Sequence, residues 1–184
     1  MIAIIDNGKG ADKIAAILRG SKIFSSKDKI PENADAYILS DGDMDPKMEK
    51  ANIELIQKLG VPVLAVGIGS IYLAKAYGGK AKELKLKVSN LTIKQKSPLL
   101  LDLKKMFSVV DGQKYFISEC PECFGVLAGA PGYDYAMIQF GTNPEIDEEP
   151  LPIFGMHFNP EGGLDGIKIL KNFQSFVEVW GKYH

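Results

Sequence analysis

Short apolar runs and segments with helical spacing alternate along the first half of the chain. The apolar runs predict strands at residues 2–5, 22–25, 36–39 and 61–66, and the last run is apolar throughout, as in a strand buried on both faces. Between the runs, apolar residues recur every three or four positions and predict helices at residues 11–18, 47–59 and 70–77. Asn52 is the one polar residue on the apolar face of the second helix. This alternation is typical of a mostly parallel sheet covered by helices.

The second half has a different pattern, in which short β-type runs predominate. Strands are predicted at residues 84–88, 91–94, 107–110, 115–118, 124–128, 136–140 and 153–158, and a long amphipathic helix at residues 166–180. The acidic stretch at residues 145–149 is expected to be a solvated loop. With no repeat or linker, residues 1–184 are expected to form a single α/β domain. Its fold would be an open, mostly parallel sheet flanked by helices, flavodoxin-like, with a β-rich second half.

Composition and charge restrict the classes of function. Apolar residues make up 46% of the 184 positions and charged residues 24%, which is typical of a globular protein. The formal net charge of -1 argues against nucleic-acid binding, which needs an excess of positive charge on one face. Arg19 is the only arginine, so lysines would have to supply any anion site. No apolar run is long enough to span a bilayer and the start lacks a basic leader, so we expect a cytoplasmic protein without membrane contact.

The two cysteines, Cys120 and Cys123, form a lone C-x-x-C motif. A structural zinc site would need two further ligands, and no second pair exists. A thioredoxin-type motif would open a helix, whereas Pro121 and the apolar run after it predict a turn into a strand. We expect ordinary unreactive thiols, with a local disulfide or a redox role as the alternative. Neither a metal nor a cofactor is expected.

Residues 62–79 are the most informative segment, because a buried strand runs directly into a helix through the sequence GIGS at residues 67–70. Such sharp turns raise one residue at the helix N-terminus, where backbone N–H groups and the helix dipole stabilise an anion. A dinucleotide-binding G-x-G-x-x-G motif would need glycine where Tyr72 stands. A glycine turn that serves packing alone is the plainer alternative.

The sequence PVLAVGIGSI at residues 62–71 resembles the nucleophile turn P-V-L-G-I-C-L-G-H-Q of the class I glutamine amidotransferases. Gly67 stands at the position of the family's cysteine, and Ser70 and Ile71 replace its His-Gln pair. The family's Gly-Gly pair, after the helix, matches residues 78–79.

Five further segments, at residues 4–8, 39–46, 124–128, 155–163 and 169–173, extend the resemblance over nearly the whole chain, which is most similar to the glutaminase domains (the A subunits) of GMP synthetases. LSDGDMDP at residues 39–46 resembles the loop that completes the oxyanion hole, which implies an oxyanion-hole-like pair of amides at Gly42 and Ile68. GMHFNPEGG at residues 155–163 resembles the segment with the catalytic His and Glu, where this chain has Asn159 and retains Glu161.

The resemblance implies that no catalytic set is intact. Glutamine hydrolysis in the family needs a cysteine thiolate and a histidine base, and Gly67 and Asn159 supply neither. Loss of such a nucleophile lowers the rate about a millionfold in a related triad. A substitute Ser70–His157 pair is the alternative, because His157 lies two residues before Asn159 and shares a strand face with it. His157 is more simply explained as a packed or hydrogen-bonded residue.

We therefore expect a catalytically degenerate protein related to the GMP synthetase glutaminase of purine biosynthesis, which acts by binding. Its partner would be an ATP-pyrophosphatase synthetase subunit, or its ligand a small amino acid or nucleotide. The pocket is expected to include Asp41, Asp43, Ser70 and His157, and acidic Asp41 and Asp43 at its rim would favour an amine or a metal. The alternatives are a GMP synthetase-associated enzyme that hydrolyses glutamine or another amide at a non-standard site, and a different hydrolase or binding module that kept only the fold.

Overall fold

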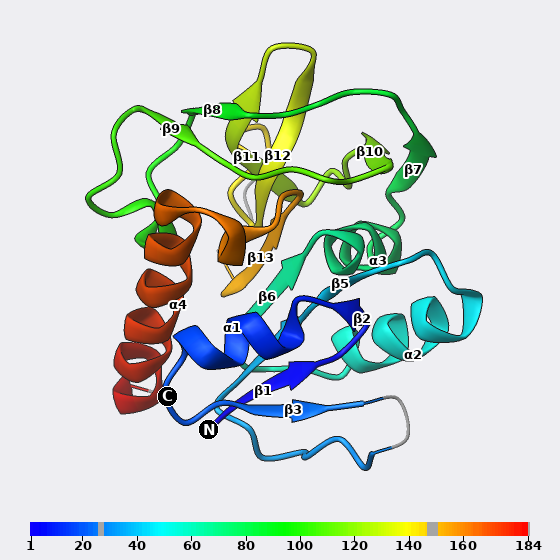
Figure 1. The fold of residues 1–184 in the computed structure, drawn as a ribbon, viewed down its shortest axis with the longest axis vertical. Helices are drawn as coiled ribbons and strands as arrows, with labels where there is room; N and C mark the ends of the chain where they lie inside the picture. Colours follow the sequence, from blue (N-terminus) through cyan, green and yellow to red (C-terminus); the bar gives the residue numbers. More distant parts are fainter. Residues whose placement is uncertain (26–27, 147–150, 184) are drawn as a thin grey trace.

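A nine-stranded sheet forms the centre of the computed structural model, which describes residues 1–25, 28–146 and 151–183 (Figure 1). Its first five strands are parallel, in the order β3 (Lys22–Phe24), β1 (Ile2–Ile5), β4 (Ala36–Leu39), β6 (Val63–Val66) and β13 (Ile153–Met156). The sheet then continues with antiparallel neighbours: β12 (Tyr133–Phe140), β11 (Phe124–Ala130), β8 (Asn90–Ile93) and β9 (Met106–Ser108).

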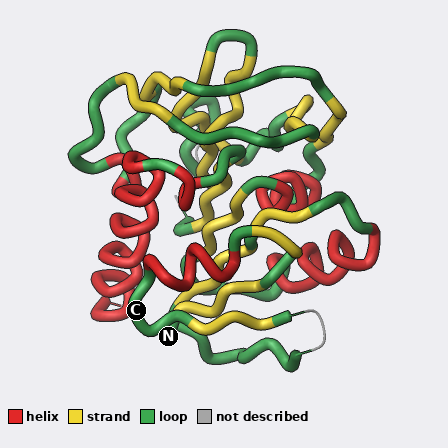
Figure 2. The backbone as a smooth tube through the Cα atoms, viewed as in Figure 1, coloured by secondary structure: helices red, strands yellow, loops and turns green. Residues whose placement is uncertain are grey.

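Four helices and two small ribbons complete the described part of the chain. The helices are α1 (Ala11–Ile17), α2 (Pro46–Ile56), α3 (Ile68–Ala76) and α4 (Leu164–Tyr183), with 3-10 turns η1 (Pro98–Leu100) and η2 (Pro160–Gly162). The two-stranded ribbons pair β2 (Gly8–Lys9) with β5 (Asp41–Gly42), and β7 (Lys80–Glu83) with β10 (Tyr115–Glu119). The helices gather around the parallel strands, and the antiparallel end consists mainly of strands and loops (Figure 2).

The parallel strands are buried on both faces, because alternate residues of each strand join different hydrophobic clusters. Ile2 and Ile4 of β1 pack in the cluster that contains apolar residues of α1 and α4, whereas Ala3 and Ile5 pack in the cluster with residues of α2 and α3. The sheet is therefore sandwiched between two helix layers. Helix α2 begins sharply because the Asp45 side chain accepts hydrogen bonds from the N–H groups of Lys47 and Met48.

The predicted α/β fold, with its sheet flanked by helices and its β-rich second half, is confirmed. The predicted strand at residues 84–88 is wrong: the strand lies at residues 80–83, and the N–H of Val88 donates to the Asp111 carboxylate instead of to a neighbouring strand. The acidic stretch at residues 145–149 lies partly outside the described residues. Within the part of the chain that the structure describes, no helix is long and apolar enough to cross a membrane. The single-domain expectation stays a prediction.

Candidate functional site

The candidate site lies at the carboxyl ends of the central parallel strands. Asn7 follows β1, Ser40 and Asp41 follow β4, Gly67 follows β6, and His157 follows β13. Because these strands are parallel neighbours, their carboxyl ends meet at one edge of the sheet, where open α/β sheets bind their ligands.

A buried amide pair fixes the loop after β4. Asn7 and Asn52 exchange side-chain hydrogen bonds of 2.8 and 3.2 Å, so the polar residue on the apolar face of α2 has a polar partner. Asn7 also donates from its backbone N–H to Ser40 Oγ at 2.9 Å and from Nδ2 to the Ser40 carbonyl at 2.9 Å. Gly42 packs directly against the Asn7 carbonyl, where an added Cβ would overlap it. These contacts hold residues 40–42 against the end of β1.

Gly67 forms the corner between β6 and α3. Its backbone has φ 54° and ψ −118°, a conformation that residues with a side chain rarely adopt. The Gly67 N–H donates to the Met156 carbonyl at 2.9 Å, and the Gly67 carbonyl accepts from the N–H and the hydroxyl of Ser70 at 3.0 and 2.7 Å. The corner is thus tied to β13 on one side and to the first turn of α3 on the other.

The side chain of Asp41 fills the space in front of this corner. A Cβ at position 67 would lie closer than 3.0 Å to three atoms of Asp41, namely Oδ1, Cγ and Cβ. Asp41 Oδ1 accepts a hydrogen bond of 2.9 Å from the N–H of Ile68. Its Oδ2 accepts from Gln113 Nε2 and from Asn159 Nδ2, both at 3.0 Å. Gln113 Nε2 also lies 3.2 Å from Asn159 Oδ1, which closes the cluster. The buried Asp41 carboxylate therefore accepts hydrogen bonds from three donors at the corner.

Little open space remains beside this cluster. The cavity lined by Asp41, Gly42, Ile68 and Gln113 has a volume of about 50 Å³. A single water needs roughly 10–15 Å³, and drug-sized ligands bind in pockets of about 300 Å³ or more. The site has room for a few waters but not for an amino acid in the present side-chain arrangement.

The rim of the cavity carries an ion pair between Lys9 and Asp43, whose charged atoms are 2.6 Å apart. The hydrogen bond raises the pKa of Lys9 and lowers that of Asp43, and both side chains are exposed. Behind them, the Tyr72 hydroxyl accepts a 3.1 Å hydrogen bond from the Asp45 N–H. Tyr72 therefore anchors the loop that carries Asp43 onto α3.

Glu161 lies beside the cluster and faces Gly10 at the start of α1. Burial is the main cause that raises the pKa of its carboxyl, and Asp41 adds to the effect. Its Oε2 atom is buried and has no hydrogen-bond partner.

His157 and Asp111 form a second buried polar pair. His157 is 1% exposed and lies against the rings of Phe116 and Tyr133, at centroid distances of 4.2 and 4.8 Å. Its Nε2 is 3.6 Å from Asp111 Oδ1, and neither ring nitrogen makes a hydrogen bond. Burial lowers the pKa of His157 to about 4, against a smaller opposing effect of the Asp111 charge. The imidazole is therefore neutral near pH 7.

Most of the chain matches a known protein family. The model of the class I glutamine amidotransferase family matches residues 9–177. The chain belongs to the class I glutamine amidotransferases. It is 27% identical to the A subunit of the glutamine-hydrolyzing GMP synthase of Methanocaldococcus jannaschii, over 94% of this chain and 95% of that protein. It is 28% identical to the protein of the same name from Methanococcus aeolicus, over 99% and 100%.

Solved structures show the same fold. A putative A subunit of GMP synthase from Thermoplasma acidophilum superposes with a TM-score of 0.86 at 18% identity and covers 98% of this chain and 95% of its own. A glutamine amidotransferase from Thermotoga maritima gives a TM-score of 0.71 at 15% identity, over 100% and 85%. At these identities the likeness concerns the fold alone.

The structure brings most of the residues expected from the amidotransferase resemblance to one place. Asp41, Gly42, Gly67 and Ile68 meet at the corner, and Asn159 and Glu161 lie beside it. Asp41 was expected at the rim but points inward and is 6% exposed, because three donors draw its carboxylate into the corner. Asp43 is the rim residue.

The contacts of Ser70 and His157 differ from those of a nucleophile and its base. Ser70 is 1% exposed and its hydroxyl donates to the Gly67 carbonyl, whereas His157 contacts two aromatic rings and Asp111. Sequence reasoning missed Gln113, which lies in an irregular loop 46 residues before Asn159, and no periodicity or motif marks it. Asn7 was also missed, although the polar interruption at Asn52 was a signal that a buried partner exists.

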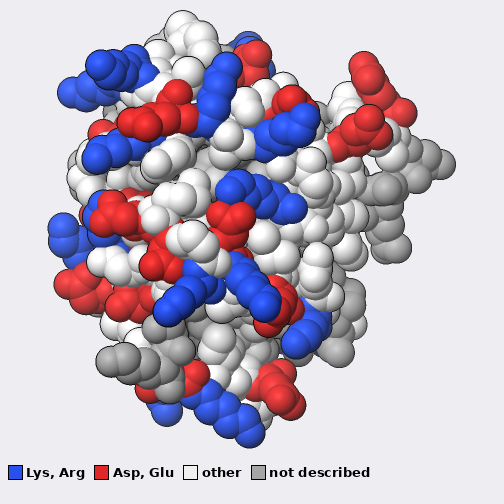
Figure 3. Space-filling view, turned by 90° about the vertical axis from the view of Figure 1, so that its right-hand side faces the viewer, with Lys and Arg blue, Asp and Glu red and all other residues white. Residues whose placement is uncertain are grey.

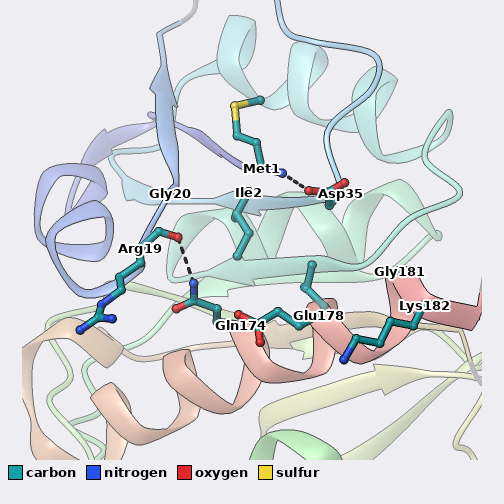
Figure 4. Close-up of a pocket in the computed structure, with 10 residues that line it drawn as sticks. Met1, Ile2, Arg19, Gly20, Asp35, Gln174, Glu178, Gly181 and Lys182 are labelled. Carbon is teal, nitrogen blue, oxygen red and sulfur yellow. Dashed lines mark hydrogen bonds and ion pairs between the residues drawn. The ribbon is translucent and has the colours of Figure 1, made fainter.

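Two other features lie away from the corner. A cavity of about 420 Å³ is found at the opposite edge of the sheet, where the N-terminus meets the end of α4 (Figure 4). There the N-terminal ammonium pairs with Asp35, and Gln174 donates to the Arg19 carbonyl, while the Arg19 side chain extends away from that ion pair. Cys120 is half-buried, and burial raises the pKa of its thiol to about 12, so the reactive thiolate is scarce at neutral pH.

Proposed function

We propose that this chain is a non-hydrolysing class I glutamine amidotransferase that works as a binding subunit of a GMP synthase-type assembly in purine biosynthesis. The observation that carries the proposal is the position of the Asp41 carboxylate. It occupies the volume that any side chain at position 67 would need, and it accepts the hydrogen bond of the Ile68 N–H. In the family resemblance, that volume belongs to the nucleophile and that amide to the oxyanion.

The chemistry at the corner supports the same conclusion. Gly67 has no atom that could attack an amide, and the amide of Asn159 does not titrate near neutral pH, so it cannot serve as a general base. Asn159 instead donates to Asp41. An anion that forms during hydrolysis would meet a fixed negative carboxylate where an oxyanion hole offers free donors. The corner therefore lacks a nucleophile and a base, and the N–H of Ile68 is already used by Asp41.

Binding to a protein partner fits the site better than binding of a small ligand. The relatives that match over nearly their whole length are named as the A subunit of a GMP synthase, a name that designates one part of a larger assembly. The cavity at the corner, about 50 Å³, is too small for glutamine or a nucleotide. We infer that the partner is the ATP-pyrophosphatase synthetase subunit.

The first test is ammonia release. The purified chain would be incubated with glutamine, both alone and with the synthetase subunit plus its other substrates, and ammonia would be measured. The relative from Methanocaldococcus jannaschii, assayed in parallel, serves as the positive control. We expect no release above the buffer blank. Turnover that disappears in a Ser70→Ala or His157→Ala variant would overturn the proposal in favour of a non-standard active site.

A second test asks whether Asp41 and the missing groups account for the lack of hydrolysis. A variant that combines Asp41→Gly, Gly67→Cys and Asn159→His would clear the corner and restore the family's two reacting groups. Its thiol should react with an electrophilic glutamine analogue, whereas Gly67→Cys alone should fold poorly or remain blocked by Asp41. Equal labelling of the single and the triple variant would contradict the role given to Asp41.

A further inference from the structure

Four exposed apolar side chains form a surface patch around β9 and the start of α4. Leu101, Met106, Val110 and Leu164 are 60%, 63%, 46% and 87% exposed, and they make up four of the nine large exposed apolar residues in the described part of the chain. We call this group the β9 patch. In Figure 1 the strand β9 lies next to the first turn of α4. Apolar side chains that gather on a surface indicate a binding face, whereas single ones do not.

Hydrogen bonds and packing contacts place the segments that carry the four residues next to one another. The Ser108 N–H donates to Asp165 Oδ2 at 2.9 Å, which joins β9 to the residue after Leu164. Val110 packs against Gly162 and Gly163, immediately before Leu164. Lys168 and Asn172, four and eight residues after Leu164 on α4, donate to the carbonyls of Asp102 and Leu101. Residues spaced by four share one helix face, so this face connects Leu164 with Leu101.

Lysines outnumber acidic residues beside the β9 patch. Lys94, Lys104 and Lys105 are exposed and flank the paired strands β8 and β9, and Lys168 lies nearby on α4. Asp102 and Asp165 are the acidic residues in the same place. On the side of the molecule that carries α2 and α3, acidic and basic side chains are intermingled (Figure 3). Lysines on an edge strand also prevent edge-to-edge aggregation, but that role does not require exposed apolar side chains beside them.

The β9 patch is connected to the corner at Gly67. The Asn159 N–H donates to the Val110 carbonyl at 2.9 Å, and Asn159 also holds Asp41. Asp111, which follows Val110, accepts a 2.9 Å hydrogen bond from the N–H of Gln113, the second residue that holds Asp41. A partner seated on Val110 would therefore touch the loop that completes the Asp41 cluster.

We propose that the β9 patch docks an acidic, apolar-centred face of the synthetase subunit; this inference rests on the proposed function. The occupant follows from charge. A symmetric contact between two copies of the chain would bring the exposed lysines of both copies into one interface, which opposes association. An acidic rim on a different protein complements these lysines. The apolar centre supplies the surface that is buried on binding. The lysines select a partner of opposite charge and raise the association rate.

The test is a binding titration of the synthetase subunit onto the whole chain, for the wild type and three single variants. Leu164→Glu and Met106→Glu place a charge in the patch, and an acidic residue in the first turn of a helix is compatible with folding. Val179→Glu is the matched control, because Val179 is 53% exposed on the same helix, far along it from the patch. We expect Kd to rise at least about tenfold in both patch variants and to stay unchanged in the control. Wild-type binding should also weaken as the salt concentration rises.

The outcomes separate the two proposals. If the wild type binds the synthetase and the patch variants bind equally well, the β9 patch is the wrong surface and the proposed function stands. If the wild type does not bind at micromolar concentrations, both the docking function and this inference are overturned. Sedimentation of the chain alone decides the remaining case: a wild-type dimer that Leu164→Glu dissociates would assign the patch to self-association instead.

Discussion

Two buried polar clusters lie side by side near the carboxyl edge of the sheet, and they differ in how well their polar atoms are satisfied. In the first, the Asp41 carboxylate accepts three hydrogen bonds, from Ile68, Gln113 and Asn159. In the second, His157 lies 3.6 Å from Asp111 and neither of its ring nitrogens makes a hydrogen bond. The clusters share two segments of chain, because Asp111 and Gln113 are two residues apart, as are His157 and Asn159.

The difference separates a stabilising arrangement from a destabilising one. A buried polar network with every member bonded contributes to stability and fixes one conformation, whereas a buried group without a partner costs about 1–3 kcal/mol. Active sites commonly keep unsatisfied or strained groups, because substrates complete them. The Asp41 cluster is complete without a ligand. The corner at Gly67 therefore has the properties of a structural cluster. The polar atoms without partners are the ring nitrogens of His157, in the second cluster.

The largest effect is expected for Gly67→Ala, which tests whether Asp41 really blocks the corner. The added Cβ meets Asp41 and must adopt a φ of +54°, so the variant should lose about 4 kcal/mol of unfolding free energy. Gly132→Ala is the matched control: its φ is +80° and an added Cβ contacts nothing within 4 Å. Backbone strain alone should cost the control about 1–2 kcal/mol. Urea denaturation measures both.

A double variant isolates the clash from the strain. In an Asp41→Gly background, Gly67→Ala should cost at least about 1 kcal/mol less than in the wild type, because the overlapping carboxylate is gone. Identical costs in the two backgrounds would show that the corner is strained but not filled.

Asp41→Ala should have the next largest effect, about 2–3 kcal/mol of unfolding free energy. The change leaves the Ile68 N–H and the amides of Gln113 and Asn159 without their shared acceptor. Asp41→Asn is the control of matched shape, and it keeps one acceptor oxygen and should lose less. The ratio of the two losses, from thermal or urea unfolding, measures how far the carboxylate charge stabilises the first cluster.

The second cluster predicts a loss of stability in mild acid. Burial lowers the pKa of His157 to about 4, below the value near 6.5 of an unfolded chain, so the unfolded state takes up a proton first as pH falls. The stability contributed by neutral His157 is fully present above pH 6.5 and is lost between pH 6.5 and 4. The loss from pH 7 to pH 5 is about 2 kcal/mol of unfolding free energy. The difference in unfolding free energy between wild type and His157→Leu, measured by urea denaturation at each pH, isolates the contribution of His157. A constant difference across that range would mean that His157 gains a partner on protonation.

Much of this architecture followed from the apolar pattern. The strand at residues 36–39 was predicted within its observed bounds, because a strand buried on both faces must be apolar throughout. The prediction of a strand at residues 84–88 was wrong, because an alternating run such as LKLKV forms a strand only where a neighbouring strand pairs with its backbone hydrogen-bonding groups. The Asp111 carboxylate takes the N–H of Val88 instead.

The candidate site was predictable in its position but not in its contacts. The glycine turn and the family resemblance located Gly67 and Asn159. That Asp41 turns inward depends on Gln113, 72 residues away in an irregular loop, and no local pattern encodes that approach. The polar break at Asn52 indicated a buried polar partner, but only the fold identifies it as Asn7.

The smallest effect concerns Glu161, which lies beside Asp41 and Asn159 of the first cluster. Burial raises the pKa of its carboxyl and its Oε2 has no partner, so the folded state holds its proton more tightly than the unfolded chain does. The charged form is therefore unfavourable at pH 7, and this penalty disappears as pH falls toward the raised pKa. Glu161→Gln should be neutral or stabilising at pH 7, by less than about 1 kcal/mol, and the wild type should close the gap in acid. If the variant instead lost more than about 2 kcal/mol at pH 7, the Glu161 carboxylate would stabilise the first cluster, and that cluster would not be complete with Ile68, Gln113 and Asn159 alone.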